Sequence, residues 1–134
     1  MTEVIGPIVM GVVVAIINLI FMIKSESGDA KTVIGHGFGE LVYLIPLAFL
    51  AFNIDFVLNL GFLPEVVKNK TIILVALGLI AAILVHVKSA LFPKARGAGT
   101  HEKWIQSLIV GALIALSPFI WGYIGPWIKE IIGI

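Results

Sequence analysis

Long apolar runs alternate with short polar segments along nearly the whole chain. Crossing the hydrocarbon core of a bilayer as a helix takes ~20 predominantly apolar residues. Four runs come close to this length: residues 4–23, 41–60, 71–87 and 104–124, the third extending toward Phe92 before Pro93. The pattern predicts an all-α protein with four hydrophobic, transmembrane-type helices arranged as two helical hairpins, with both termini on the same side.

Two segments beside these runs have predicted roles of their own. The glycine-rich "GHGFGE" (residues 35–40) is expected to be a flexible segment before the second span, with Glu40 near that helix's N-terminus, where the helix dipole favours a carboxylate. The C-terminal "GPWIKEIIGI" (residues 125–134) is amphipathic and is expected to lie at the membrane interface. We expect no cleaved signal peptide, because the first span lacks a basic n-region and is too long for an h-region.

The composition supports a membrane protein of a single domain. Hydrophobic residues make up 60% of the 134 residues and charged residues 13%, whereas soluble domains are about half apolar and about a quarter charged. The absence of cysteine excludes disulfides, iron–sulfur clusters and thiolate zinc sites. The formal net charge of +1 argues against a polyanion bound by overall charge.

The two polar loops between paired spans resemble one another. Lys24 and Ser25 recur as Lys88 and Ser89, and His36 recurs as His101 at a spacing one residue longer. Each segment ends an apolar run, passes through a small loop containing Gly and reaches His before the next run. This predicts a tandem duplication of a hairpin, with copies at about residues 1–63 and 64–134. The alternative is that loops between membrane spans share this composition without common origin.

No motif of an enzyme or metalloprotein stands out. "GHGFGE" lacks the strand, the helix and the glycine spacing of a dinucleotide fingerprint. His36 and Glu40 are four residues apart and could share a helix face, but a metal site would need further ligands from His86, His101 or Glu102. We therefore predict no enzyme, no metal and no cofactor. Membrane lipid is the one bound ligand that we expect.

A possible intramembrane polar site lies in the second predicted span. Acidic groups inside membrane spans usually mark a pathway or a pair, and this span contains Asn53 and Asp55. Asn18 would contribute from the first span. The alternative is that Asp55 lies at the interface, because the polar end of the span has already begun at Asn53 and Asn59.

Small and aromatic residues indicate helix packing and membrane boundaries. Gly78 with Ala82, and Gly111 with Ala115, form small-xxx-small pairs that predict close helix contacts. An aromatic belt is predicted around the fourth span; its members are Trp104, Trp121, Tyr123 and Trp127.

Basic residues gather in the two hairpin loops. Three lie on the other side of the predicted membrane: Lys68, Lys70 and Lys129. Six lie in or beside the loops: Lys24, Lys31, Lys88, Lys94, Arg96 and Lys103. The positive-inside rule therefore predicts cytoplasmic hairpin loops and both termini outside. The six loop residues are the predicted lipid-headgroup or lumen-facing site, because anionic headgroups attract basic side chains.

The hairpin unit, the external termini and the short basic loops resemble the pilins of conjugative, type IV secretion pili. The resemblance covers the topology of the whole chain and no diagnostic motif. It implies a structural subunit that rests in the inner membrane and assembles with its own copies into a hollow, lipid-containing extracellular filament, through which nucleic acid passes without sequence-specific binding. Two features depart from the family: this chain has four predicted spans instead of two, and no long cleaved leader. A hairpin-built coat protein of a membrane-containing virus fits the same features.

Two other functions fit the same architecture. One is a small ion or solute transporter or channel, lined by Asp55, Asn18 and Asn53. Four short spans resemble the small multidrug transporters in size, but those carry an acidic residue deep in the first span, which residues 4–23 lack. The other is an accessory subunit of a larger membrane complex. We favour self-assembly, because the predicted polar residues lie in the loops and a carrier needs them in the spans.

The orientation can be tested by single-cysteine labelling, since the chain has no cysteine of its own. Cysteines replacing Ser27 or Gly99 are expected to resist an impermeant thiol reagent in intact cells, and cysteines replacing Thr2 or Ile134 are expected to react. The reverse pattern would contradict the predicted topology and the pilin resemblance with it.

Overall fold

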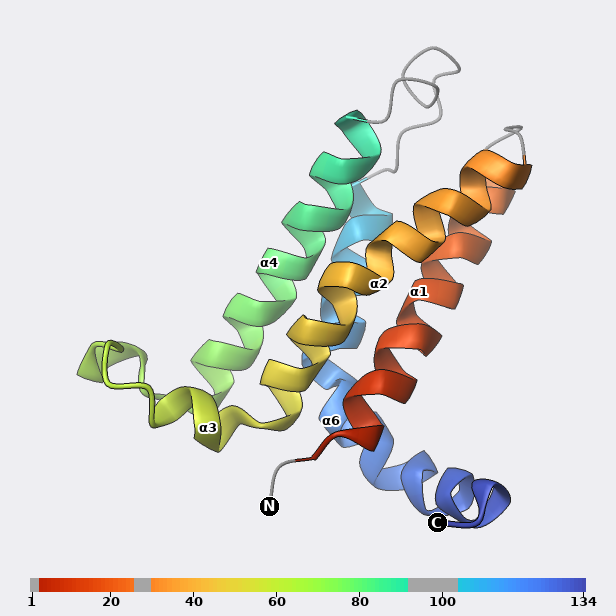
Figure 1. Ribbon diagram of the computed structural model, residues 1–134. Coiled ribbons are helices and arrows are strands. Elements are labelled where there is room, and N and C mark those ends of the chain that lie inside the picture. The colour runs from red at the N-terminus through yellow and green to blue at the C-terminus, as the bar shows by residue number, and fades with distance from the viewer. Residues whose placement is uncertain (1–2, 26–29, 92–103) are drawn as a thin grey trace.

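The computed structural model describes residues 3–25, 30–91 and 104–134, and these residues are all-helical with no strand (Figure 1). This confirms the predicted all-α class. The elements, in chain order, are α1 (Ile5–Ser25), α2 (Ala30–Phe52), α3 (Ile54–Leu58), η1 (Glu65–Val67), α4 (Lys70–Leu91) and α6 (Trp104–Ile132).

Two helices of the described chain are long and apolar enough to cross a membrane. They are the Lys70–Val87 part of α4 and the whole of α6. The corresponding parts of α1 and α2 are shorter apolar helices, Ile5–Phe21 and Gly37–Phe52. By length and composition, therefore, two of the four predicted spans meet the requirement for a spanning helix.

The long helices pack as neighbouring pairs. α1 lies along α2 and α4 lies along α6, while α6 also contacts α1 and α2, and α2 contacts α4. α1 and α4 run in one direction, and α2 and α6 return in the other (Figure 1). We call the end where α1 and α4 finish the hairpin end. The opposite, terminal end holds both chain termini and the α3–η1 segment (Figure 1).

The second helix differs from the predicted span at both of its ends. It begins at Ala30 instead of Leu41, so "GHGFGE" lies inside it and the expected flexible segment is wrong. An apolar environment explains the difference: a helix satisfies its own backbone hydrogen bonds, and neighbouring helices make glycine tolerable there. The helix ends at Phe52 instead of Leu60, because Asn53 leaves helical geometry (φ −109°, ψ 49°) and only the short α3 follows.

The other helices agree with their predicted spans more closely. α1 and α4 end within a few residues of the expected positions. The C-terminal segment is continuous with the fourth helix, since α6 runs on to Ile132, and its last turns bend away from the bundle (Figure 1). Trp127 and Ile131 are exposed on these last turns.

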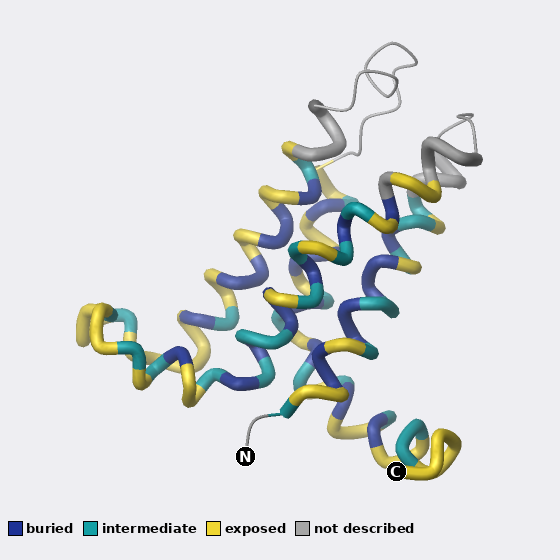
Figure 2. Tube along the Cα trace, viewed as in Figure 1, coloured by how far each residue is buried: buried dark blue, intermediate teal, exposed yellow. Residues whose placement is uncertain are grey.

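Apolar side chains occupy both the centre and the outer sides of the bundle. The buried core includes Val14, Leu44, Ala81, Val110 and Ile114 from the four long helices. Exposed positions run along the outer sides of the same helices (Figure 2). Large apolar residues among them are Ile16, Val42, Ile83 and Leu108. A bundle that is apolar on both its inner and its outer faces is typical of a membrane protein.

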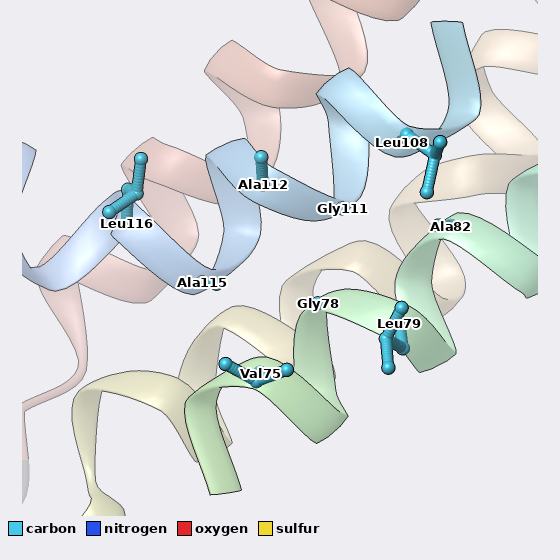
Figure 3. A pocket seen from close by; sticks show the side chains of 9 residues that line it. All are labelled: Val75, Gly78, Leu79, Ala82, Leu108, Gly111, Ala112, Ala115 and Leu116. Atoms are coloured by element: carbon cyan, nitrogen blue, oxygen red, sulfur yellow. The ribbon is translucent and has the colours of Figure 1, made fainter. Parts of the chain in front are cut away.

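Small residues bring α4 and α6 into close contact, as predicted (Figure 3). A Cβ atom added at Gly78 would lie 2.8 Å from the Gly111 carbonyl oxygen and 3.1 Å from the Ala115 Cβ atom. A Cβ atom added at Gly111 would meet the Gly78 carbonyl oxygen and lie 3.0 Å from the Ala82 Cβ atom. The two small-xxx-small pairs therefore face each other, and this confirms the predicted packing seam.

α6 continues through Pro118 because a neighbouring hydroxyl takes over the lost hydrogen bond. Proline has no N–H to offer the carbonyl four residues before it, here that of Ile114. The Ser117 Oγ donates to that carbonyl oxygen instead, at 2.6 Å, and both Ser117 and Ile114 are fully buried. The helix thus crosses the proline without leaving this buried acceptor unsatisfied.

The glycine seam predicts a position-dependent response to alanine. Gly111→Ala is expected to lower the free energy of unfolding in detergent by about 1–3 kcal/mol, because the added methyl group overpacks a backbone contact. Gly122→Ala in the same helix is the matched control, since nothing lies within 4 Å of its added Cβ. The control is expected to be neutral or stabilising by up to about 1 kcal/mol. Equal effects at the two positions would contradict the seam.

Candidate functional site

A hydrogen-bonded carboxylate and amide lie in the interior of the bundle. The Asn18 Nδ2 in α1 donates to the Glu40 Oε1 in α2 at 2.5 Å, and both residues are fully buried. They meet because α1 and α2 pack side by side and run in opposite directions (Figure 1). Glu40 is thus a buried acidic residue with a named partner between two apolar helices, which makes it a candidate for a functional role.

The pair lies well inside the bundle. Glu40 follows the start of α2 at Ala30 by ten residues, which is a depth of about 15 Å from the hairpin end at 1.5 Å per residue. One helical turn farther from that end, Val14 and Leu44 are fully buried and apolar. An apolar layer of the core therefore lies next to the pair, on the side of the terminal end.

Burial makes the loss of this hydrogen bond more costly for stability than the loss of one at the surface. A buried polar group left without its hydrogen-bond partner costs about 1–3 kcal/mol. The pair therefore favours one register of α1 against α2, because a slip by one residue would remove the donor from the buried carboxylate.

A second polar contact lies at the hairpin end between α4 and α6. The His86 and Trp104 rings stack with their centroids 3.7 Å apart and 15° between their planes. The His86 Nδ1 also lies 3.5 Å from the Oγ of the fully buried Ser107. Trp104 therefore packs against α4 as well as beginning α6, a role that the aromatic-belt prediction does not include.

Asn53 joins the N-terminal segment to the end of α2. Its Oδ1 accepts from the Glu3 backbone N–H at 2.8 Å, and its Nδ2 donates to the Glu3 and Phe49 carbonyl oxygens, each at 2.9 Å. The Glu3 carboxylate in turn accepts from the Gly6 N–H at 3.1 Å, near the start of α1. These bonds give Asn53 a structural role where α2 ends.

Asp55 lies apart from the buried pair, at the terminal end. Its Oδ1 is 3.0 Å from the Lys70 Nζ, and the two side chains are 76% and 61% exposed. Exposed ion pairs contribute about 0–1 kcal/mol. The structure thus brings Asp55 together with Lys70 from the start of α4, and places Asn18 beside Glu40 instead of beside Asn53 or Asp55.

The predicted basic site can be located only in part. Lys24 and Lys88 lie in the last turns of α1 and α4, and Lys31 lies in the first turn of α2, so their backbones share the hairpin end. Their side chains, and the whole of Lys94, Arg96 and Lys103, lie outside the described residues. Contact of these residues with lipid headgroups therefore stays a prediction.

The metal hypothesis gains no support in the part of the chain that is described. No group of three or more His, Asp or Glu side chains comes together there. The side chain of His36, and all of His101 and Glu102, lie outside that part.

The sequence pattern did not identify Glu40 as a buried residue, because it predicted that the second helix begins at Leu41. Three glycines in six residues suggest a loop in a soluble protein, and a helix boundary after them makes Glu40 a terminal residue. The useful signal is that apolar residues resume at Val33 and Ile34, before the glycines. Asn18, the strongly polar residue of the first span, then indicates a buried partner on a neighbouring helix.

No known protein family, curated protein or solved structure matches this chain. Its function is therefore argued from its own residues and geometry.

The buried pair predicts an asymmetric response to mutation. Asn18→Leu is expected to lower the free energy of unfolding by about 1–3 kcal/mol, because Glu40 stays buried without this donor. The double variant Asn18→Leu/Glu40→Met is expected to recover most of the loss, since an apolar pair of similar volume can replace a buried polar one.

Asp55→Asn is the exposed control for this double-mutant cycle, with an expected change within about 1 kcal/mol. Denaturation in detergent, followed by circular dichroism, measures these variants, the parent protein and the single variant Glu40→Met, which completes the cycle. Additive effects of the two substitutions would show that the pair is not coupled.

Proposed function

We propose that the chain is an integral membrane protein whose four long helices, α1, α2, α4 and α6, cross the bilayer as two hairpins. The distribution of charge is the observation that carries this proposal. Among the described side chains, Glu40 is the one Asp, Glu, Lys or Arg that lies between the two ends of the bundle. The outer sides are apolar, and the exposed ion pairs of Lys68 with Glu65 and Lys70 with Asp55 lie at the terminal end. Apolar side chains on the outside of a bundle are more stable in contact with lipid tails than in contact with water.

Within the membrane, we propose that the protein is a structural subunit that assembles with its own copies, in the manner of a conjugative pilin. Its apolar outer sides can pack against lipid and against further copies, as a lipid-containing filament requires. The basic residues of the hairpin end would then face lipid phosphate or the lumen. In this proposal the hairpin loops are cytoplasmic before assembly and the filament is extracellular afterwards, a conduit for nucleic acid without sequence readout.

Electron microscopy of the native source, with no detergent added, tests the assembly proposal. We expect filaments or particles that contain this chain and lipid. The double variant Lys94→Glu/Arg96→Glu is expected to insert into the membrane but not to assemble, because like charges near lipid phosphate repel; each basic residue near an anionic surface contributes about 1 kcal/mol.

Lys68→Glu, a charge reversal at the terminal end, is the matched control and is expected to assemble. Normal assembly of the double variant would contradict a role for the hairpin-end charges. A chain found only as dispersed membrane protein would contradict the pilin-like proposal itself.

A second candidate function, ion- or proton-coupled transport, is favoured by the buried Glu40. A carrier needs an ionisable group inside its spans, and Glu40 meets this requirement where the exposed Asp55 does not. In proteoliposomes, Glu40→Gln is expected to abolish any coupled flux of the wild-type protein, since the amide cannot exchange a proton. Asp55→Asn is the control and is expected to retain that flux. Loss of flux in the control with retention in Glu40→Gln would reject this candidate.

A further inference from the structure

We propose that the segment between α2 and α4 is a lipid-contact surface, which inserts Phe56, Phe62 and Val66 into the membrane at the terminal end. We call residues 53–69 the connecting segment. Its partner is the phospholipid leaflet on that side, at the boundary between headgroups and acyl chains. The inference rests on the proposed membrane placement of the four helices and not on self-assembly.

The connecting segment is longer than a turn between two packed helices needs to be, and it is fixed to the bundle. Helix–helix connections in bundles commonly have about 2–8 residues, whereas this one continues from the end of α2 to one side of the bundle (Figure 1). Val57 is buried in the core. Four further residues of the segment pack against the core: Ile54, Leu58, Leu60 and Leu63. One side of the segment is therefore held in place by apolar contacts with the helices.

The remaining large apolar side chains of the segment are mostly exposed. Phe56, Phe62 and Val66 are 55%, 76% and 84% exposed, and exposed positions run along this part of the chain (Figure 2). Burying apolar side chains of this size away from water is favourable. Several of them close together on one segment indicate a surface that contacts a partner.

Contacts with α4 place the connecting segment at the membrane boundary. α4 begins at Lys70 and is one of the two helices long and apolar enough to span. The Lys70 Nζ lies 3.0 Å from the Asp55 Oδ1, and the Asn69 Oδ1 accepts from the Thr71 N–H at 2.9 Å. Charged residues at the start of a spanning helix lie at the level of the headgroups. The segment that pairs with this start therefore lies at the same level.

Aromatic residues of α6 indicate the same level independently. Phe52 ends α2 directly before the connecting segment, and its ring meets that of Trp121 edge-on, with the centroids 6.5 Å apart. Tyr123 and Trp127 follow in α6 and are exposed. Trp and Tyr are enriched where headgroups meet acyl chains. The partner that fits the exposed side of the connecting segment is thus the lipid of this layer.

The charges of the segment favour apolar contact with lipid over binding to its phosphate. Glu65 pairs with Lys68 at 2.7 Å, and Asp55 pairs with Lys70. These are the charged residues from 53 to 70, and two acidic and two basic side chains cancel. A surface without net charge gains little from an anionic membrane. We therefore expect zwitterionic lipid to be sufficient.

Nitroxide labels on single cysteines test the proposal, since the chain has no cysteine of its own. The full chain is placed in dioleoylphosphatidylcholine vesicles, and electron paramagnetic resonance compares collisions of each label with oxygen, which concentrates in the membrane, and with a water-soluble nickel chelate. Labels at Phe62→Cys and Val66→Cys are expected to prefer oxygen several-fold more strongly than a label at Glu65→Cys. Glu65 is the matched control because it is the exposed neighbour of Val66 in η1. Adding anionic phosphatidylglycerol is expected to leave these preferences unchanged.

A label at Ile80→Cys separates this proposal from the membrane placement. Ile80 is exposed and follows the start of α4 at Lys70 by ten residues, which is about 15 Å into the membrane at 1.5 Å per residue. Its label is expected to prefer oxygen most strongly. Free collision of this label with the nickel chelate would reject the membrane placement itself.

Two results would overturn the lipid contact while the Ile80→Cys label lies in the membrane. One is that labels at Phe62→Cys and Val66→Cys behave like the label at Glu65→Cys, because the surface then faces water. The other is that they are shielded from both reagents and become accessible when the protein is diluted in lipid, because a second copy then covers the surface.

Removal of the two rings gives a second check. In the background Phe56→Ser/Phe62→Ser, the label at Val66→Cys is expected to lose most of its preference for oxygen, because the segment has lost its largest apolar contacts. The label at Ile80→Cys in the same background is expected to keep its preference, which shows that the bundle is still inserted. An unchanged preference at Val66→Cys would overturn the proposal that these rings hold the segment in the membrane.

Discussion

A polar group inside an apolar bundle has to find its hydrogen-bond partner within the protein, and much of this structure follows from that constraint. Away from bulk water, an unmade hydrogen bond costs more than it does at a surface. Asn18 meets Glu40 across the α1–α2 contact, and Asn53 binds the backbone of Glu3. Ser117 donates to the carbonyl group that Pro118 deprives of its usual partner. Each bond determines where one helix lies, ends or continues.

The two helix pairs are held together by different kinds of contact. α4 and α6 approach closely because glycine and alanine face each other at Gly78 and Gly111. α1 and α2 also include a close approach, since a Cβ added at Gly11 would lie 3.0 Å from the Ile45 Cα atom, but this pair adds the buried bond between Asn18 and Glu40. If the pairs descend from one duplicated hairpin, as the sequence predicts, their contacts have diverged in chemistry while their directions have been kept.

The two ends of the bundle differ in the polar groups that they carry. The terminal end carries exposed ion pairs, such as that of Asp55 with Lys70, and the bent last turns of α6. The side of the bundle toward the hairpin end holds Glu40, and the Ser107–His86 contact lies at that end. The two ends therefore differ in chemistry: one has a buried polar pair near it, and the other has ion pairs exposed on its surface.

The sequence by itself determined the helical class, the boundaries of α1 and α4 and the glycine seam, since hydrophobic run length and small-residue spacing are local properties. It could not determine where α2 begins, because glycines that favour a loop in water are tolerated in a helix packed among apolar neighbours. That boundary decided the candidate site. With α2 starting at Ala30, Glu40 moves from a helix terminus to the interior and meets Asn18, while Asp55 moves to an exposed end. Only the tertiary structure decided this, because the burial of a carboxylate depends on which helices surround it and not on the residues beside it in the chain.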